Sequence, residues 1–131
     1  VAARRPYIVL DGAQNRASAR ALAEAIRKIF RYMRLILVLG VSKDKDVAGI
    51  VEELSPLADA VILTKADMPE RALEPSALAS HICAPKDITL TATVGEAVVK
   101  ARDAAGPEDL VLVAGSLFVV GEAKVVLEND N

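Results

Sequence analysis

Cysteine, tryptophan and aromatic residues in general are scarce in this sequence. Its 131 residues include one cysteine, no tryptophan and 3% aromatic residues, while 53% are hydrophobic. A single cysteine, Cys83, excludes an internal disulfide and a cysteine-based zinc cluster. We interpret Cys83 as a small packed hydrophobic residue, because no arrangement of nucleophile and base is visible around it. The core is therefore expected to consist of aliphatic side chains and alanine, which suits helices packed closely on a sheet.

Long apolar runs are lacking as well. No stretch approaches the roughly 20 residues that cross a membrane, and the chain does not open with the charged, apolar and small-residue segments of a signal peptide. We expect a soluble protein of the cytoplasm without membrane contact.

The length favours one domain over residues 1–131, large enough to bury roughly two thirds of its unfolded surface. The sequence opens with Val1 instead of methionine and enters its first apolar run within a few residues. We therefore expect a domain that has been cut from a longer chain.

Positive charge is confined largely to the beginning of the chain. Residues 1–34 contain eight Arg and Lys against two acidic residues, whereas the remainder contains eight against sixteen. Arg20, Arg27, Arg31 and Arg34 recur at helical spacing, which predicts a solvated helix face. We expect no nucleic-acid partner, because we expect no aromatic stacking platform among these basic residues. The same basic patch could instead attract a polyanionic ligand.

Short apolar runs alternate with longer segments of helical period. Strands are expected over residues 7–10, 35–39, 60–64, 88–91 and 110–114, and helices over 17–33, 47–54, 75–82, 94–105 and 116–127. Continuous apolar strands joined by helices are typical of parallel sheets that are covered on both faces. The sequence therefore predicts an α/β fold: a Rossmann-like, mainly parallel sheet with helices on both faces.

For two of the helices, the sequence also predicts which residues are buried. The buried face of the first should contain Leu22, Ile26, Ile29, Phe30 and Met33. The last segment is rich in valine and could be a strand. We expect a helix capped by Ser116, because its apolar residues fall largely on one stripe; these are Leu117, Val120, Ala123, Val126 and Leu127.

Polar clusters follow four of the expected strands, at residues 11–16, 40–46, 64–67 and 115–116. Because ligands of open parallel sheets bind at the carboxyl ends of the strands, this edge is a generic candidate site. The usual signatures are missing from it: the sequence has neither a G-x-x-x-x-G-K-[ST] phosphate loop nor a G-x-G-x-x-G motif. From the residues alone, the candidate site is incomplete.

Five segments also carry a family resemblance: DGAQN at 11–15, LVLGVSKDKDVAGI at 37–50, PLADAVILTKAD at 56–67, ERAL at 70–73 and DLVLVAGSLFVVGEAK at 109–124. Together they resemble the carboxy-terminal, glutamate-ligase domain of folylpolyglutamate synthase and dihydrofolate synthase, within the Mur ligase family. Each motif is weak, but the five occur in register over nearly the whole chain.

The resemblance implies an ATP-dependent reaction. Such enzymes convert a pteroate-type carboxylate to an acyl phosphate, which the amine of glutamate attacks to form an amide. ATP and Mg²⁺ are the implied cofactors, and pteroate or folate and glutamate the implied substrates. The phosphate loop would belong to an upstream domain of the same chain, which would leave the isolated domain inactive.

The resemblance also implies site residues. Asp11, Gln14 and Asn15 would lie at the nucleotide, with Asp11 near the ribose hydroxyls. Gln14 stands where the family usually has histidine, and Arg16 where proline is common. Gln14 exchanges neutral hydrogen bonds but cannot carry a proton as histidine does.

Three further residues are implied at the incoming glutamate. Ser116 would lie near its carboxylate, where a helix amino terminus also favours an anion. Arg71 and Lys45 are candidate contacts, although Met68 replaces the asparagine that is common near Arg71. No metal ligands are implied within this segment.

Two other classes of function stay open at this stage. A free-standing Rossmann-like module could bind a small anion or a nucleotide. Alternatively, the polar edge could serve only as a docking face, because the faces between domains of one chain are fairly polar.

Overall fold

Five parallel strands form one sheet in the computed structural model, which describes residues 6–82 and 87–129. Their order across the sheet is β1-β5-β2-β3-β4, and all four neighbouring pairs run parallel. The strands are β1 (Tyr7–Asp11), β2 (Leu35–Leu39), β3 (Ala60–Leu63), β4 (Asp87–Leu90) and β5 (Leu110–Ala114). The predicted strands are confirmed to within one residue at each end. Cys83 lies outside the described residues.

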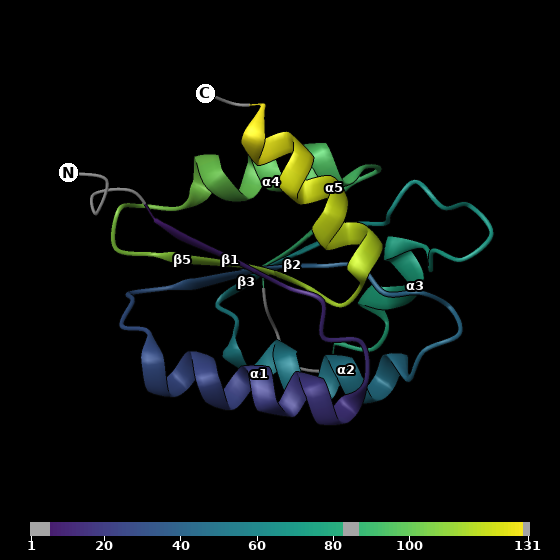
Figure 1. Ribbon diagram of the computed structural model, residues 1–131, viewed down its shortest axis with the longest axis horizontal. Helices are drawn as coiled ribbons and strands as arrows, with labels where there is room; N and C mark the ends of the chain where they lie inside the picture. The colour runs from purple at the N-terminus through teal and green to yellow at the C-terminus, as the bar shows by residue number, and fades with distance from the viewer. Residues whose placement is uncertain (1–5, 83–86, 130–131) are drawn as a thin grey trace.

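Helices cover both faces of the sheet (Figure 1). On one face lie α1 (Arg16–Ile29), α2 (Val47–Leu54) with the short 3-10 helix η2 (Ser55–Leu57), and α3 (Pro75–Ala79). On the other face α4 (Val94–Ala104) and α5 (Leu117–Glu128) pack side by side. The predicted Rossmann-like fold is therefore confirmed, although α3 is three residues shorter than expected.

Alternating side chains of the central strands build two separate cores. Leu35, Leu37 and Leu39 of β2 face α1 and α2, whereas Ile36 and Val38 face α4 and α5. Every residue of β2 and β5 is buried. Each fully buried aliphatic side chain contributes roughly 1.5–3 kcal/mol through the hydrophobic effect. The uninterrupted apolar runs are thus explained by helices on both sides.

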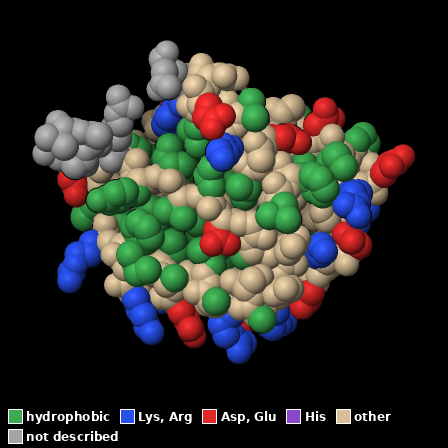
Figure 2. All heavy atoms as spheres, in the orientation of Figure 1, with side chains coloured by type: hydrophobic (Ala, Val, Ile, Leu, Met, Phe, Trp, Pro, Cys, Tyr) green, Lys and Arg blue, Asp and Glu red, His purple; other side chains and the backbone are tan. Residues whose placement is uncertain are grey.

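The edge strand β1 pairs only with β5 among the described strands. Figure 2 shows hydrophobic side chains gathered over this edge, where Tyr7 is exposed. No helix in the described part of the chain is long and apolar enough to cross a membrane.

Helix α1 ends four residues earlier than its periodicity predicts, at Ile29 instead of Met33. The following segment turns back to the sheet and is held by a 2.8 Å hydrogen bond from the Met33 N–H to the Glu108 carbonyl oxygen. The predicted buried face is therefore partly wrong: Leu22 and Ile26 are buried, but Ile29 and Met33 are 71% and 76% exposed. Helical periodicity could not reveal a contact with a residue so distant in sequence.

Helix α5 confirms the helical interpretation of the valine-rich segment. Ser116 is its N-cap, and the hydroxyl accepts hydrogen bonds from the N–H groups of Phe118 and Val119. The predicted stripe is largely confirmed, because Ala123 is buried and Val120, Val126 and Leu127 pack half-buried against the core. Leu117 is exposed instead, and Val119 is a further buried residue.

Asp109 anchors the amino end of the sheet. Its buried carboxylate accepts hydrogen bonds from the Gly106 N–H at 2.8 Å, from the Arg34 N–H at 3.2 Å and from the Arg34 guanidinium at 3.0 Å. Burial acts to raise the pKa of Asp109, but the hydrogen bonds from Gly106 and Arg34 outweigh it, so this pKa lies below that of an ordinary aspartate. The segment before β2 is thereby tied to the start of β5.

Gly115 joins β5 to α5 in a conformation that other residues rarely adopt. Its φ is +103°, and a Cβ here would lie 2.5 Å from the Gly40 carbonyl oxygen and 2.7 Å from a Leu39 methyl carbon. Both the backbone conformation and the space therefore require glycine at this position.

The first prediction concerns Gly115. Gly115→Ala should lower the free energy of unfolding by about 1–3 kcal/mol, because it combines backbone strain with a clash. Gly121→Ala is the matched control, because a Cβ there meets nothing within 4 Å. Because Gly121 lies within a helix, Gly121→Ala should instead raise the free energy of unfolding by about 0.5–1 kcal/mol. Urea unfolding measures both, and equal effects of the two substitutions would contradict the assignment.

The second prediction concerns Asp109. Asp109→Asn should lower the free energy of unfolding by about 1–3 kcal/mol at pH 7, because charged hydrogen bonds are lost in a buried place. A carboxyl whose folded-state pKa is depressed stabilises the fold above its unfolded pKa of about 3.9 and loses that effect as pH falls through the folded-state value. Urea unfolding between pH 7 and pH 3 should therefore show the two proteins converging below about pH 4. A difference that stays constant with pH would exclude this role of the carboxylate.

Candidate functional site

The carboxyl ends of the strands meet at one edge of the sheet, as predicted. Two glycines bring the segments there into close contact. Gly12 has no Cβ, which leaves space for the Leu117 side chain at the start of α5. A Cβ on Gly40 would lie 2.8 Å from a Val119 methyl carbon and 2.9 Å from the Thr64 carbonyl oxygen. The ends of β1, β2, β3 and β5 therefore form one packed surface.

The turn after β1 holds the three residues predicted at the nucleotide. Asp11 uses Oδ1 to accept the Ala13 N–H at 2.9 Å, which shapes the turn. Neither Asp11 Oδ2 nor the Gln14 side chain makes a hydrogen bond to any described residue, and both residues are half-buried. The turn thus presents a carboxylate oxygen and a carboxamide at the sheet edge.

Asn15 has a structural task. Its Oδ1 accepts the Ser18 N–H at 2.7 Å, and the Ser18 hydroxyl in turn accepts the Asn15 N–H at 3.2 Å. This reciprocal pair is the capping box that begins α1. The oxygen of Asn15 is therefore occupied by the helix end, in contrast to Asp11 Oδ2.

Arg16 lies along α2, from its N-cap to its last turn. Its guanidinium contacts Glu52 at 2.9 Å, Glu53 at 3.4 Å and Asp46, the N-cap of α2, at 3.9 Å. Glu53 also forms an ion pair with Arg20 at 3.0 Å. Its hydrogen bond with Arg20 lowers the pKa of Glu53, and Arg16 adds to this effect. Arg16, which stands where the family commonly has proline, thus connects the turn after β1 with α2 and the loop before it.

The loops after β2 and β3 run antiparallel to each other. Ser42 and Ala72 form a β-bridge, and the Lys43 N–H donates to the Arg71 carbonyl oxygen at 2.7 Å. The Arg71 guanidinium lies 5.6 Å from the centre of the Phe118 ring on α5. Lys45 is exposed nearby in the β2 loop and makes no ion pair with a described residue. Arg71 is thus placed beside α5, while Lys45 stays free in solvent.

Ser116 is 4% exposed, and its hydroxyl is occupied by the helix cap. The hollow beside it measures only about 10 Å³. Such a space holds at most about one water molecule. In this conformation an amino acid does not fit against the Ser116 hydroxyl, and the residue acts here as the cap of α5.

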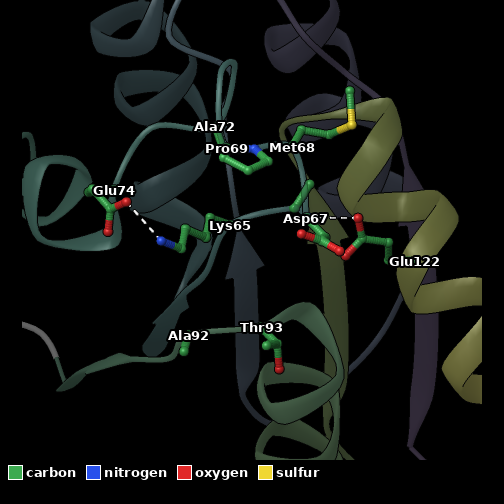
Figure 3. A pocket seen from close by; sticks show the side chains of 10 residues that line it. Lys65, Asp67, Met68, Pro69, Ala72, Glu74, Ala92, Thr93 and Glu122 are labelled. Atoms are coloured by element: carbon green, nitrogen blue, oxygen red, sulfur yellow. Dashed lines mark hydrogen bonds and ion pairs between the residues drawn. The ribbon is translucent and has the colours of Figure 1, made fainter.

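A larger cleft of about 500 Å³ opens where the ends of β3 and β4 face α5 (Figure 3). On one side Lys65 pairs with Glu74 at 2.8 Å, and on the other Glu122 accepts the Asp67 N–H at 2.8 Å. Thr93, the N-cap of α4, also lines the cleft and lies below Lys65 and Asp67 in this view. Sequence reasoning missed Glu122 and Thr93, because no local pattern tells which loop a helix side chain will meet. Lys65 and Asp67 fall within the predicted polar edge.

The cleft holds one cationic and three acidic side chains. Even so, within residues 6–82 and 87–129 no three His, Cys, Asp or Glu side chains gather closely enough to hold a metal ion. The edge offers hydrogen-bonding groups and single charges, which suits recognition of polar ligands.

Comparison with known proteins agrees with this geometry. The model of the family "Mur ligase, glutamate ligase domain" matches residues 1–117. A probable bifunctional folylpolyglutamate synthase/dihydropteroate synthase of Halobacterium salinarum is 39% identical over 121 residues, which span 91% of this chain and 14% of that protein. E. coli FolC in complex with ADP has a TM-score of 0.85 at 26% identity, over 93% of this chain and 29% of FolC.

Another similar structure is a bifunctional folylpolyglutamate synthase/dihydrofolate synthase with Mn, AMPPNP and L-glutamate bound. Its TM-score is 0.84 at 28% identity, over 94% of this chain and 29% of that one. The fold and the polar edge thus define a ligase-type Rossmann-like domain. The chain belongs to the Mur ligase family, as its glutamate ligase domain. The resemblance stated from the five motifs is confirmed, and the chain spans less than a third of the length of these relatives.

The third prediction concerns Arg16. Arg16→Gln should make the hydrogen-bonded amides of α1 that follow Arg16 and those of the last turn of α2 exchange with solvent roughly two- to fivefold faster, because the ion pairs between these helices are lost. Arg27→Gln is the control: it removes the same charge from α1, but Arg27 makes no ion pair with a described residue. Hydrogen exchange followed by NMR resolves these sites. Equal exchange in both variants would show that Arg16 does not brace the turn.

Proposed function

We propose that this chain is the glutamate-binding part of an ATP-dependent ligase, which joins glutamate to a pteroate or folate carboxylate through an acyl phosphate. The observation that carries the proposal is the unpaired Asp11 Oδ2 and Gln14 carboxamide at the carboxyl end of β1, in a chain of the Mur ligase family. The phosphate loop is proposed to lie on an upstream domain of a longer chain. Two observations support this placement. The present sequence contains no phosphate loop, and the related proteins are more than three times as long as this chain.

On the nucleotide side, Asp11 is the central residue. A carboxylate oxygen accepts hydrogen bonds, and a ribose offers two neighbouring hydroxyl donors. Oδ1 holds the turn through Ala13, so Oδ2 is the oxygen that would accept from the ribose. Gln14 and the Asn15 amide group would add neutral hydrogen bonds to the nucleotide. Gln14 and Asn15 cannot accept a proton as a histidine would.

The residues present fit ATP, but not a complete metal site. No group of metal ligands gathers in the described part of the chain. We therefore assign the ligands of Mg²⁺ to the upstream domain and to the phosphates. When bound, the ion neutralises phosphate charge during transfer. This chain would orient the ribose and close the nucleotide off from water.

On the amino-acid side, Arg71 and Lys45 are the cations that would meet the two carboxylates of glutamate. Arg71 lies over Phe118, beside the amino terminus of α5 that Ser116 caps. A helix amino terminus favours an anion, so the two elements would act on the same carboxylate. A related enzyme was solved with L-glutamate bound, which supports this substrate. Holding the amine near the acyl phosphate is the main task left to these residues.

The fourth prediction tests the proposal in the ligase that contains this chain. Asp11→Asn keeps an oxygen for the Ala13 N–H but removes the charge at Oδ2, so KM for ATP should rise about tenfold or more. Asp103→Asn on the exposed surface of α4 is the control and should leave KM unchanged. Steady-state ADP formation with varied ATP measures both.

Two outcomes would contradict the proposal. An unchanged KM for ATP in Asp11→Asn would remove Asp11 from the nucleotide site. ADP formation by residues 1–131 alone, given ATP, glutamate and pteroate, would show that no upstream domain is needed. Nucleotide binding by the chain alone, without participation in a ligase, would instead favour a free-standing binding module.

A further inference from the structure

A second hollow lies at the opposite edge of the sheet from the candidate site, where α1 ends and the chain turns toward β2. It measures about 500 Å³ and is lined by Arg27, Lys28, Phe30, Arg31 and Tyr32. Small-molecule sites commonly enclose roughly 300–1,000 Å³. The strands separate this hollow from the ligands proposed at Asp11, so the proposed ligase function does not account for it.

Its three cations lack anionic partners. Arg16, Arg20 and Arg34 all make ion pairs, whereas Arg27, Lys28 and Arg31 make none with any described residue. Glu24, one turn before Lys28, does not pair with it. Figure 2 shows basic side chains projecting along the lower rim, where α1 runs in Figure 1. No carboxylate of the described chain therefore pairs with the cations of the hollow.

The segment that forms the hollow is held at several points. Phe30 packs edge to face on Tyr7 with ring centres 5.7 Å apart, and its N–H bonds the Ile26 carbonyl oxygen at 3.2 Å. Two residues of the segment, Met33 and Arg34, are tied to the turn before β5. A binding site whose shape is held in advance loses less entropy when it binds a ligand.

Two aromatic residues indicate which class of ligand the hollow can hold. Phe30 and Tyr32 line it beside the basic residues. Both rings pack against the core beneath α1 and are only partly exposed. They therefore form a wall for a small ligand more readily than a platform on which successive bases stack.

We propose that this hollow binds a small anion with two or more linked negative groups, either phosphates or carboxylates. The carboxyl end of α1 already favours Arg27 and Lys28 through the helix dipole. Arg31 lies beyond the end of α1, so the helix dipole does not explain its position, yet it lines the same hollow. Arginine binds phosphate and carboxylate alike through two parallel hydrogen bonds, so both anion types share this chemistry.

The experiment titrates the ¹⁵N-labelled chain with inorganic tripolyphosphate and, separately, with tri-γ-glutamate in 150 mM NaCl. We expect one of them to shift the amides of residues 27–32 saturably, with a Kd below about 1 mM. The Arg27→Gln/Arg31→Gln double variant should weaken this binding about tenfold or more. Lys100→Gln/Lys124→Gln removes two exposed lysines from α4 and α5 and should leave binding within about twofold.

The tighter of the two probes identifies the anion type. Three results would overturn the proposal: no saturable shift with either probe, equal loss of binding in both double variants, or shifts that sulfate reproduces at the same ionic strength. The last would indicate a general ion atmosphere around the basic residues. ATP use by the ligase is not involved, so failure here leaves the proposed function untouched.

Discussion

Parallel pairing of β2 with β5 is the constraint on which the rest of the structure depends. Both strands are buried along their whole length, so each needs helices on both faces. Parallel neighbours cannot be joined by a tight turn, and each connection must cross over the sheet. All carboxyl ends therefore come to the same edge, and the polar segments after β1, β2, β3 and β5 meet there without any contact between them in sequence.

The segments at this edge are held in a fixed geometry, because their backbones pack closely against one another. Gly115 passes over the Gly40 carbonyl, and Gly12 leaves space for Leu117. Each of these contacts places the start of α5 against another loop. The position of Arg71 over Phe118 follows from the same packing. The start of α5 thus holds the turn after β1 and the loops after β2 and β3 against one another, including Arg71 in the long loop between β3 and α3.

The upstream domain that we propose would explain why the edge looks incomplete. The chain offers acceptors and cations for polar ligands but no phosphate loop and, in its described part, no cluster of metal ligands. Two departures from the family pattern have different consequences. Arg16 gains a structural role through its contacts with α2. Gln14 keeps hydrogen-bonding capacity without the proton chemistry of histidine, so the role proposed for Gln14 is limited to hydrogen bonding.

The sequence by itself determined the order and type of the elements and the cap of the last helix. Ser116 was predicted from residue preferences that act within one helical turn, and the structure confirms it. The five motifs also identified the family. The tertiary structure alone decided that Met33 is exposed and that Glu122 lines the cleft. These depend on contacts between segments far apart in the chain, which periodicity and capping, as local effects, do not encode.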